Sequence, residues 1–169
     1  MINTPMGAVV EHRYHVECWR DGALVWEDTF DNLVTTAGKN KYIDATIKTG
    51  LTSPAWYVGL VQGPGSGNTY AAADTAASHA GWTESTAYSQ ATRPAYVPGT
   101  VAGGSVDNSA SKAVFTINAT ATIAGGFLID NNTKGGSTGV LLGVGDFTVG
   151  DRPVFNGDTI NVTVTPSIT

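Results

Sequence analysis

The sequence predicts a mainly β protein: an antiparallel β-sandwich or jelly roll of about seven or eight strands, with one short helix over about residues 36–48. Three observations support this fold class. Apolar side chains recur mostly at every second position, which is the period of a strand with one buried face. The candidate strands are short and follow one another at intervals of roughly ten residues. The chain also contains 21 glycines and 7 prolines, which is typical of many turns.

The length of 169 residues fits about one domain, and the chain shows no internal repeat and no linker-like segment. We expect residues 1–8 to form an N-terminal arm that orders on a neighbouring molecule, and residues 9–169 to form a single β-sandwich domain. A jelly roll and an immunoglobulin-like sandwich have similar patterning, so the strand order stays open.

The first two strands are predicted to form a hairpin. Residues 9–19 and 23–30 alternate between apolar and polar side chains, and Asp21 and Gly22 between them favour a type I′ turn. A two-residue loop leaves both faces of this hairpin half apolar. Either a bulge shifts the register, or both faces are covered, for example by a partner subunit.

The helix follows directly. Thr35 or Thr36 can cap its first free N–H groups, and Gly50 stands where a left-handed residue commonly ends a helix. The predicted helix has a partly apolar side. Its members are Leu33, Ala37, Ile43 and Ile47.

The middle of the chain is less regular. Residues 56–61 form a short apolar run that predicts a central strand, and the glycine-rich residues 63–68 end it. Residues 71–80 favour a short helical turn closed by Gly81. Residues 82–104 are predicted to form a long, partly extended loop.

The last third returns to strands. Residues 113–117 and 121–129 are two candidates, with Gly125 and Gly126 as a candidate bulge in the second. Residues 140–149 are apolar with glycines, and residues 158–165 show the clearest alternation in the chain.

Charge and composition exclude several function classes. The chain has 9 basic and 14 acidic residues, a net charge of −5 and no basic run, so we expect no nucleic-acid partner. No apolar stretch is long enough for a membrane span, and no basic segment typical of a signal peptide precedes the first apolar run. A single cysteine, Cys18, excludes an intramolecular disulfide and a multi-cysteine metal site.

The residues that could carry chemistry do not form a recognisable site. His12 and His15 are three apart on a strand, so they point to opposite faces, and each is predicted to lie at the surface or rim. Cys18 is predicted to be a small buried hydrophobic residue. Residues 130–135 begin like a calcium loop, but Lys134 occupies a ligand position, which favours an Asx-rich turn. We therefore expect no enzymatic activity, no cofactor and no metal.

Aromatic residues are more informative. Trp82, Tyr88 and Tyr96 lie in the segment predicted to be irregular, and exposed aromatic rings in loops mark either a sugar platform or a subunit interface. We predict these three residues, together with Pro5 and Met6 of the arm, as interface or ligand contacts.

Several segments of the chain resemble a family of small virion structural proteins of tailed bacteriophages. The resemblance spans roughly residues 24–165 and is carried by FDNLVTTAGKN at 30–40, ID at 43–44, AWYVGLV at 55–61, Tyr70, DT at 74–75, SHAGWTE at 78–84, VDNSASKAVF at 106–115 and GDT at 157–159.

This resemblance implies a non-enzymatic capsid decoration or cement protein that binds and stabilises the assembled head. It implies the major capsid protein and further copies of the chain, as a homotrimer, for partners. The location would be the capsid exterior after assembly in the bacterial host cytoplasm. A tail or baseplate component is an alternative that the motifs do not distinguish. A carbohydrate-binding module for attachment to a host-surface glycan is the other.

Overall fold

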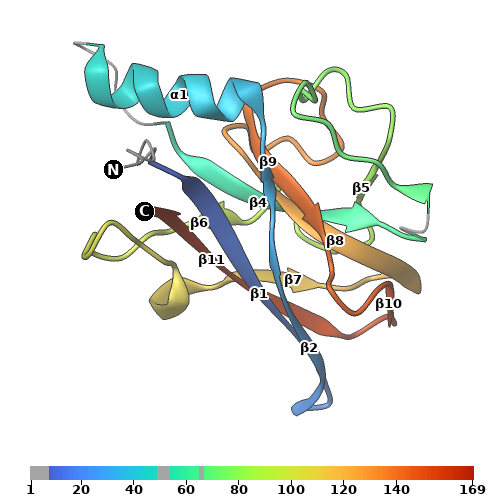
Figure 1. Ribbon diagram of the computed structural model, residues 1–169. Helices are drawn as coiled ribbons and strands as arrows, with labels where there is room; N and C mark the ends of the chain where they lie inside the picture. The colour runs from blue at the N-terminus through green and yellow to red at the C-terminus, as the bar shows by residue number, and fades with distance from the viewer. Residues whose placement is uncertain (1–7, 49–53, 65–66) are drawn as a thin grey trace, which may run out of the picture.

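Two antiparallel sheets packed face to face make up most of the protein (Figure 1). The computed structural model describes residues 8–48, 54–64 and 67–169. Sheet A has four strands in the order β2-β1-β11-β7, and sheet B has seven, with β3-β9-β8-β4-β5 as its main path. Two short strands lie off this path, because β10 pairs with β8 and β6 pairs with β4. The predicted mainly β fold with one helix is confirmed.

The strands of sheet A are β1 (Val10–Arg20), β2 (Ala23–Asp31), β7 (Ala113–Thr116) and β11 (Thr159–Ile168). Those of sheet B are β3 (Leu33–Val34), β4 (Trp56–Gln62), β5 (Glu84–Ser85), β6 (Ala95–Tyr96), β8 (Ala121–Ile129), β9 (Leu141–Asp146) and β10 (Arg152–Val154). A helix, α1 (Thr36–Ile47), and a short 3-10 turn, η2 (Ser109–Ser111), complete the elements. The strand count of eleven exceeds the prediction because β3, β5, β6 and β10 are only two or three residues long.

A bulge resolves the register of the first hairpin. Cys18 pairs with Trp26 and Trp19 pairs with Leu24, so Val25 has no opposite residue in β1. The extra residue lies in β2 and brings Trp26 and Phe30 opposite Cys18 and Tyr14, two inward-facing residues of β1, which confirms the first of the two alternatives drawn from the sequence. The turn residues Asp21 and Gly22 both have positive φ, at 49° and 79°, as the predicted turn requires.

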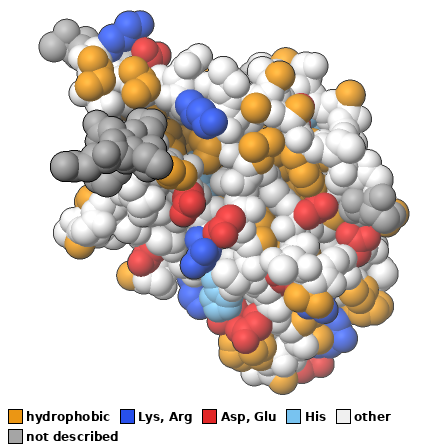
Figure 2. Space-filling view, viewed as in Figure 1, with side chains coloured by type: hydrophobic (Ala, Val, Ile, Leu, Met, Phe, Trp, Pro, Cys, Tyr) orange, Lys and Arg blue, Asp and Glu red, His pale blue; other side chains and the backbone are white. Residues whose placement is uncertain are grey.

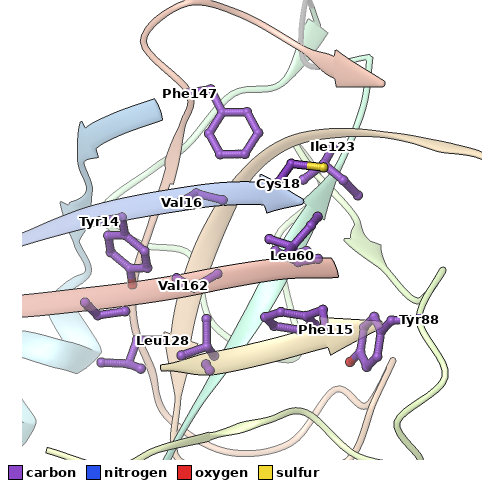
Figure 3. Close-up of a cluster of buried hydrophobic side chains, with 14 of the residues drawn as sticks. Tyr14, Val16, Cys18, Leu60, Tyr88, Phe115, Ile123, Leu128, Phe147 and Val162 are labelled. Carbon is purple, nitrogen blue, oxygen red and sulfur yellow. The ribbon is translucent and has the colours of Figure 1, made fainter. Parts of the chain in front are cut away.

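The space between the sheets is filled by the main core. Tyr14, Val16 and Cys18 of β1 point into it, and Leu60 of β4 and Leu128 of β8 meet them from sheet B (Figure 3). A second core lies on the other face of sheet B, where loop residues cover the sheet. Both faces of sheet B are therefore buried, whereas sheet A buries one.

The helix α1 lies across one end of the sandwich, beside the chain termini that the structure describes (Figure 1). Thr35 caps it, because its hydroxyl accepts a 2.9 Å hydrogen bond from the Gly38 N–H. Gly38 is the buried residue of the helix, and a Cβ there would lie 2.2 Å from the carbonyl oxygen of Leu142. Ile43 and Ile47, on the apolar side of the predicted helix, are 62% and 76% exposed, so this side does not pack against the sheets.

Two further predictions differ from the structure, and one lies outside it. Residues 71–80 form turns with an isolated bridge between Thr75 and Ser78 and no helix. The bulge predicted at Gly125 and Gly126 lies at Ala124, where the register against β4 shifts. Gly50 lies outside the described residues.

Candidate functional site

The three aromatic residues predicted as exposed contacts are buried. Trp82, Tyr88 and Tyr96 have exposed fractions of 5%, 0% and 7%. The prediction that these rings are exposed is wrong. The reason is that the loops carrying them fold back over sheet B and the edge of sheet A, so their side chains enter the core. Tyr88, for example, packs edge-on against Phe115 with ring centroids 5.0 Å apart.

Pro5 and Met6, the remaining predicted contacts, lie outside the described residues. The arm of residues 1–8 is described only at Ala8, which is exposed. The structure therefore leaves their predicted contact role as a prediction.

The structure instead brings distant aromatic and proline residues together around an apolar pocket, which we call the α1 pocket. Its volume is about 210 Å³. Six side chains give it its character: Tyr42, Pro54, Trp56, Tyr96, Pro98 and Pro166. They come from α1, the start of β4, β6 and its following loop, and the last strand, β11. The pocket thus lies where the helix crosses the end of the sandwich.

Exposed apolar side chains gather around the same end of the molecule. Ile43 and Ile47 extend from α1, and Val97 and Val101 follow β6 with exposed fractions of 50% and 70%. The residue before β1 and the last residue of β11 add Val9 and Ile168, at 50% and 46%. Figure 2 shows hydrophobic and lysine side chains over α1 on this side of the protein. We call this surface the α1 end.

Backbone hydrogen bonds hold these segments beside one another. Val9 and Thr169 exchange two, of 2.7 and 3.0 Å, and the Ile168 N–H donates to the carbonyl of Gly104. The Val106 N–H donates to the carbonyl of Pro166. The apolar surface therefore rests on the sheets and on the loop that follows β6, and its positions are fixed by the fold.

A buried polar network attaches α1 to sheet A next to this pocket. The His12 Nε2 atom lies 2.7 Å from the Tyr42 hydroxyl, and Asn32 Nδ2 lies 3.2 Å from His12 Nδ1. Both partners are neutral groups. Burial lowers the pKa of His12 to about 4, so the ring is uncharged at neutral pH. His12 and His15 do point to opposite faces, but the prediction that His12 lies at the surface is wrong.

A second pocket, of about 270 Å³, lies on the outer face of sheet B, and Trp82 lines it. Its charged residues bind one another. Arg93 donates two hydrogen bonds to Glu84, of 2.9 and 2.7 Å, and two more to the backbone carbonyls of Asn131 and Gly136. His79 stacks on Trp82 with ring centroids 4.1 Å apart and covers it. These groups hold loops together and leave few polar atoms for a ligand.

The structure bears on the other candidate residues as well. Cys18 is buried, as predicted, and burial together with nearby Asp158 raises the pKa of its thiol to about 12, so the thiol is uncharged at neutral pH. Asn131 accepts a 2.8 Å hydrogen bond from the Thr133 N–H, which confirms the Asx turn.

Within the described ranges, no three His, Cys, Asp or Glu side chains group in a way that could hold a metal ion. No helix of the described chain is long and apolar enough to cross a membrane.

Sequence reasoning missed the α1 pocket because its members are scattered. Tyr42, Trp56, Tyr96 and Pro166 lie on four separate segments, and no spacing rule links them. Part of the signal was present, because Ile43 and Ile47 form an apolar pair at i and i+4. Such a pair predicts a contact face, but it does not say whether the contact is internal or with another molecule.

The chemistry available at the α1 end is that of a binding surface. It offers aromatic and aliphatic area with Lys41 at the pocket, and burying such area against another surface is favourable.

A scan against models of known protein families finds no match to the sequence, and a comparison with curated proteins finds no significant similarity.

Proposed function

We propose that this chain is a non-enzymatic structural protein of a tailed-bacteriophage virion. In this proposal it is a decoration or cement protein that binds the outside of the assembled head, and its partners are the major capsid protein and, as a homotrimer, further copies of itself. The family proposal comes from the resemblance of residues 24–165. The observation that carries the binding role is the α1 end, where exposed apolar side chains lie at the same end of the molecule as an apolar pocket.

The α1 end supports a binding role because large apolar side chains are exposed there, two of them on α1 itself. Ile43 and Ile47 stand one turn apart on the outer side of α1, and Val101 is as exposed as they are. Singly exposed apolar residues are common, but several gathered at one end of a molecule mark an interaction site. Fully burying one such side chain stabilises a contact by about 1.5–3 kcal/mol.

The proposed mechanism is a shift in equilibrium. A protein that binds the assembled shell and not its separated subunits stabilises the shell in proportion to the logarithm of its concentration over the dissociation constant. No catalytic residue is needed. The chain contributes a rigid sandwich and an apolar surface that is already in place before binding, which lowers the entropy lost in the contact.

The direct test is binding of the purified protein to heads that lack it, measured by co-sedimentation and by the temperature at which the heads disrupt. We expect the protein to bind and to raise that temperature. The I43E/I47E variant should bind at least about tenfold more weakly, because two charges would have to be desolvated in the contact. The matched control A23E/N156E places the same two charges at exposed positions near the β1–β2 turn, at the opposite end of the sandwich, and should bind like the unaltered protein.

Copy number in purified virions separates the proposed location from its alternatives. Near-stoichiometric abundance against the major capsid protein supports head decoration, whereas a few to a few dozen copies per particle would place the chain in the tail. Absence from virions would overturn the proposal. The glycan alternative required exposed aromatic rings, and the burial of Trp82, Tyr88 and Tyr96 removes the observation from which it was drawn. A glycan panel would be the next measurement if virions lack the protein.

A further inference from the structure

The α1 pocket has the size and the wall of a site for side chains. Its volume of about 210 Å³ lies below the roughly 300–1,000 Å³ that ordinary small-molecule sites span. The rings of Tyr42, Trp56 and Tyr96 line it together with three prolines. A cavity of this size and chemistry suits one or two aliphatic side chains of a peptide segment.

The charge at this pocket is positive. Among the described residues that line it, Lys41 is the one that carries a charge. No carboxylate of the described chain forms an ion pair with Lys41, whereas Lys48, further along α1, pairs with Asp44 at 3.4 Å. The carboxylate of Asp107, in the loop after β6, instead accepts hydrogen bonds of 2.8 and 2.5 Å from the N–H and hydroxyl of Ser109. The apolar pocket therefore has an ammonium group at its wall without a counter-charge.

Trp56 adds a second donor to the wall. The residue is half-buried, and its indole N–H donates to no other group of the described chain. The side chain of Lys41 is half-buried as well. A partner that covers these donors with apolar atoms alone would desolvate them without return. A partner with acceptor oxygens beside its aliphatic side chain pairs them.

We propose that the α1 pocket binds an acidic segment of a partner protein, with an aliphatic side chain of the segment in the cavity and a neighbouring Asp or Glu carboxylate paired with Lys41. Grooves lined by aromatic rings bind extended, proline-containing segments well, because such segments lose little conformational freedom on binding. This inference rests on the proposed function in taking the α1 end as the surface that meets the partner. It goes further by naming the chemistry of the partner.

The same charges disfavour other occupants. Two copies of the chain that met through their α1 ends would bring Lys39 and Lys41 of both helices together, and like charges that face one another oppose binding. A basic segment meets the same repulsion. A neutral apolar segment would leave the ammonium of Lys41 partly desolvated and unpaired. An acidic partner is the one that gains from both the cavity and the charge.

Titration of the full chain with short synthetic peptides, blocked at both ends, tests the proposal. The acidic probe is Gly-Asp-Leu-Pro-Leu-Glu-Gly. A basic probe has lysine at both charged positions, and a third probe keeps the acids but has glycine in place of both leucines. We expect the acidic probe to bind at least about tenfold more tightly than either of the others, because it alone supplies the aliphatic side chains and the matching charge.

The readout is the indole N–H signal of Trp56 in an NMR spectrum, assigned with the Trp56→Phe variant. We expect it to shift as the acidic probe binds. Trp82 is an internal control, because its ring is 5% exposed and its indole N–H donates a 3.1 Å hydrogen bond to Asp74 on the outer face of sheet B. The signal of Trp82 should stay in place.

Charge reversal at the pocket gives the sharpest comparison. Lys41→Glu should invert the order of the acidic and basic probes, and Lys41→Gln, which covers the case in which Lys41→Glu folds poorly, should abolish the preference between them. Lys39→Glu is the matched control, because Lys39 is exposed on the same helix and does not line the pocket. This variant should keep the order of the unaltered protein.

Three results would overturn the proposal: an unmoved Trp56 signal with every probe, equal affinities for the acidic and basic probes, or an unchanged order of probes in Lys41→Glu. A Trp56 signal that moves with protein concentration in the absence of peptide would also overturn it and would identify a second copy as the occupant. None of these titrations contains phage heads. Selective peptide binding without binding to heads would contradict the proposed function alone, and head binding without peptide selectivity would contradict this inference alone.

Discussion

Sheet A and sheet B have the same antiparallel hydrogen bonding but differ in what covers them. In sheet A, β11 alternates between buried and half-buried residues over Thr159–Val164, because its outer face meets solvent. In sheet B, β8 is buried without interruption over its last seven residues, because loops cover the outer face. The four strands of sheet A contain no glycine, whereas β4, β8 and β9 together contain five. A sheet with two buried faces needs apolar residues throughout and room for what packs on both sides.

The largest expected effect comes from comparing the two outer faces directly. Phe127 on the outer face of β8 is 1% exposed and packs against Trp82 with ring centroids 5.3 Å apart. Replacing Phe127 with alanine should lower the free energy of unfolding by about 3–5 kcal/mol, because it opens a cavity between the sheet and its covering loop. Thr163→Ala, on the outer face of β11, should change it by less than about 0.5 kcal/mol. Urea unfolding of both variants measures the difference.

The comparison would fail if the two variants lost similar stability. A small effect of Phe127→Ala would mean that the covering loop contributes little and that sheet B is effectively one-sided. A large effect of Thr163→Ala would mean that the outer face of sheet A is also covered in solution, for example by a second copy of the chain.

A smaller effect is expected from the glycines that let sheet B strands lie close together. A Cβ built at Gly125 would lie 1.9 Å from the carbonyl oxygen of Gly145 in the neighbouring strand. Gly125→Ala should therefore destabilise the protein by about 2–3 kcal/mol, since a backbone atom cannot move aside as a side chain can. Gly67→Ala is the matched control, because a Cβ at that position meets no atom within 4 Å. Differential scanning calorimetry should show a lower melting temperature for the first variant alone.

The contrast between the sheets also explains how much the sequence predicted. Alternation in β1 and β11 predicted the strands of sheet A and their inward faces, including the bulge as one alternative. The apolar run of β4 predicted a central strand, and β8 was predicted as a strand without its place in the sheet. What covers sheet B could not be predicted, because Trp82, Tyr88 and Tyr96 lie in segments whose local composition is that of exposed loops. Their burial depends on contacts with residues far away in the chain, such as Phe127 and Phe115.

The candidate site was harder to predict for a related reason. The prediction placed the contact surface on loop aromatics, which are buried, whereas the structure exposes two isoleucines of the helix. A helix can be attached through few contacts. Here Thr35, Gly38 and the Tyr42–His12 pair attach α1, and none of these has an apolar pattern that sequence analysis detects.

The smallest expected effect concerns His12, a buried polar residue on the inner face of sheet A. Its folded-state pKa of about 4 lies below the value of 6.5 for an unperturbed histidine. The unfolded chain therefore binds more protons between these two values, so the folded state is most stable above pH 6.5 and loses stability as the pH falls towards 4. Between pH 7 and pH 5 this loss should amount to about 2 kcal/mol.

His12→Gln should remove this part of the pH dependence, which urea unfolding at the two pH values measures. Burial is the cause of the shift, so Tyr42→Phe should keep the pH dependence even though it deletes the 2.7 Å contact. Equal pH dependence in the unaltered protein and in His12→Gln would show that His12 is hydrated, and that the inner face of sheet A is open to water where α1 crosses it.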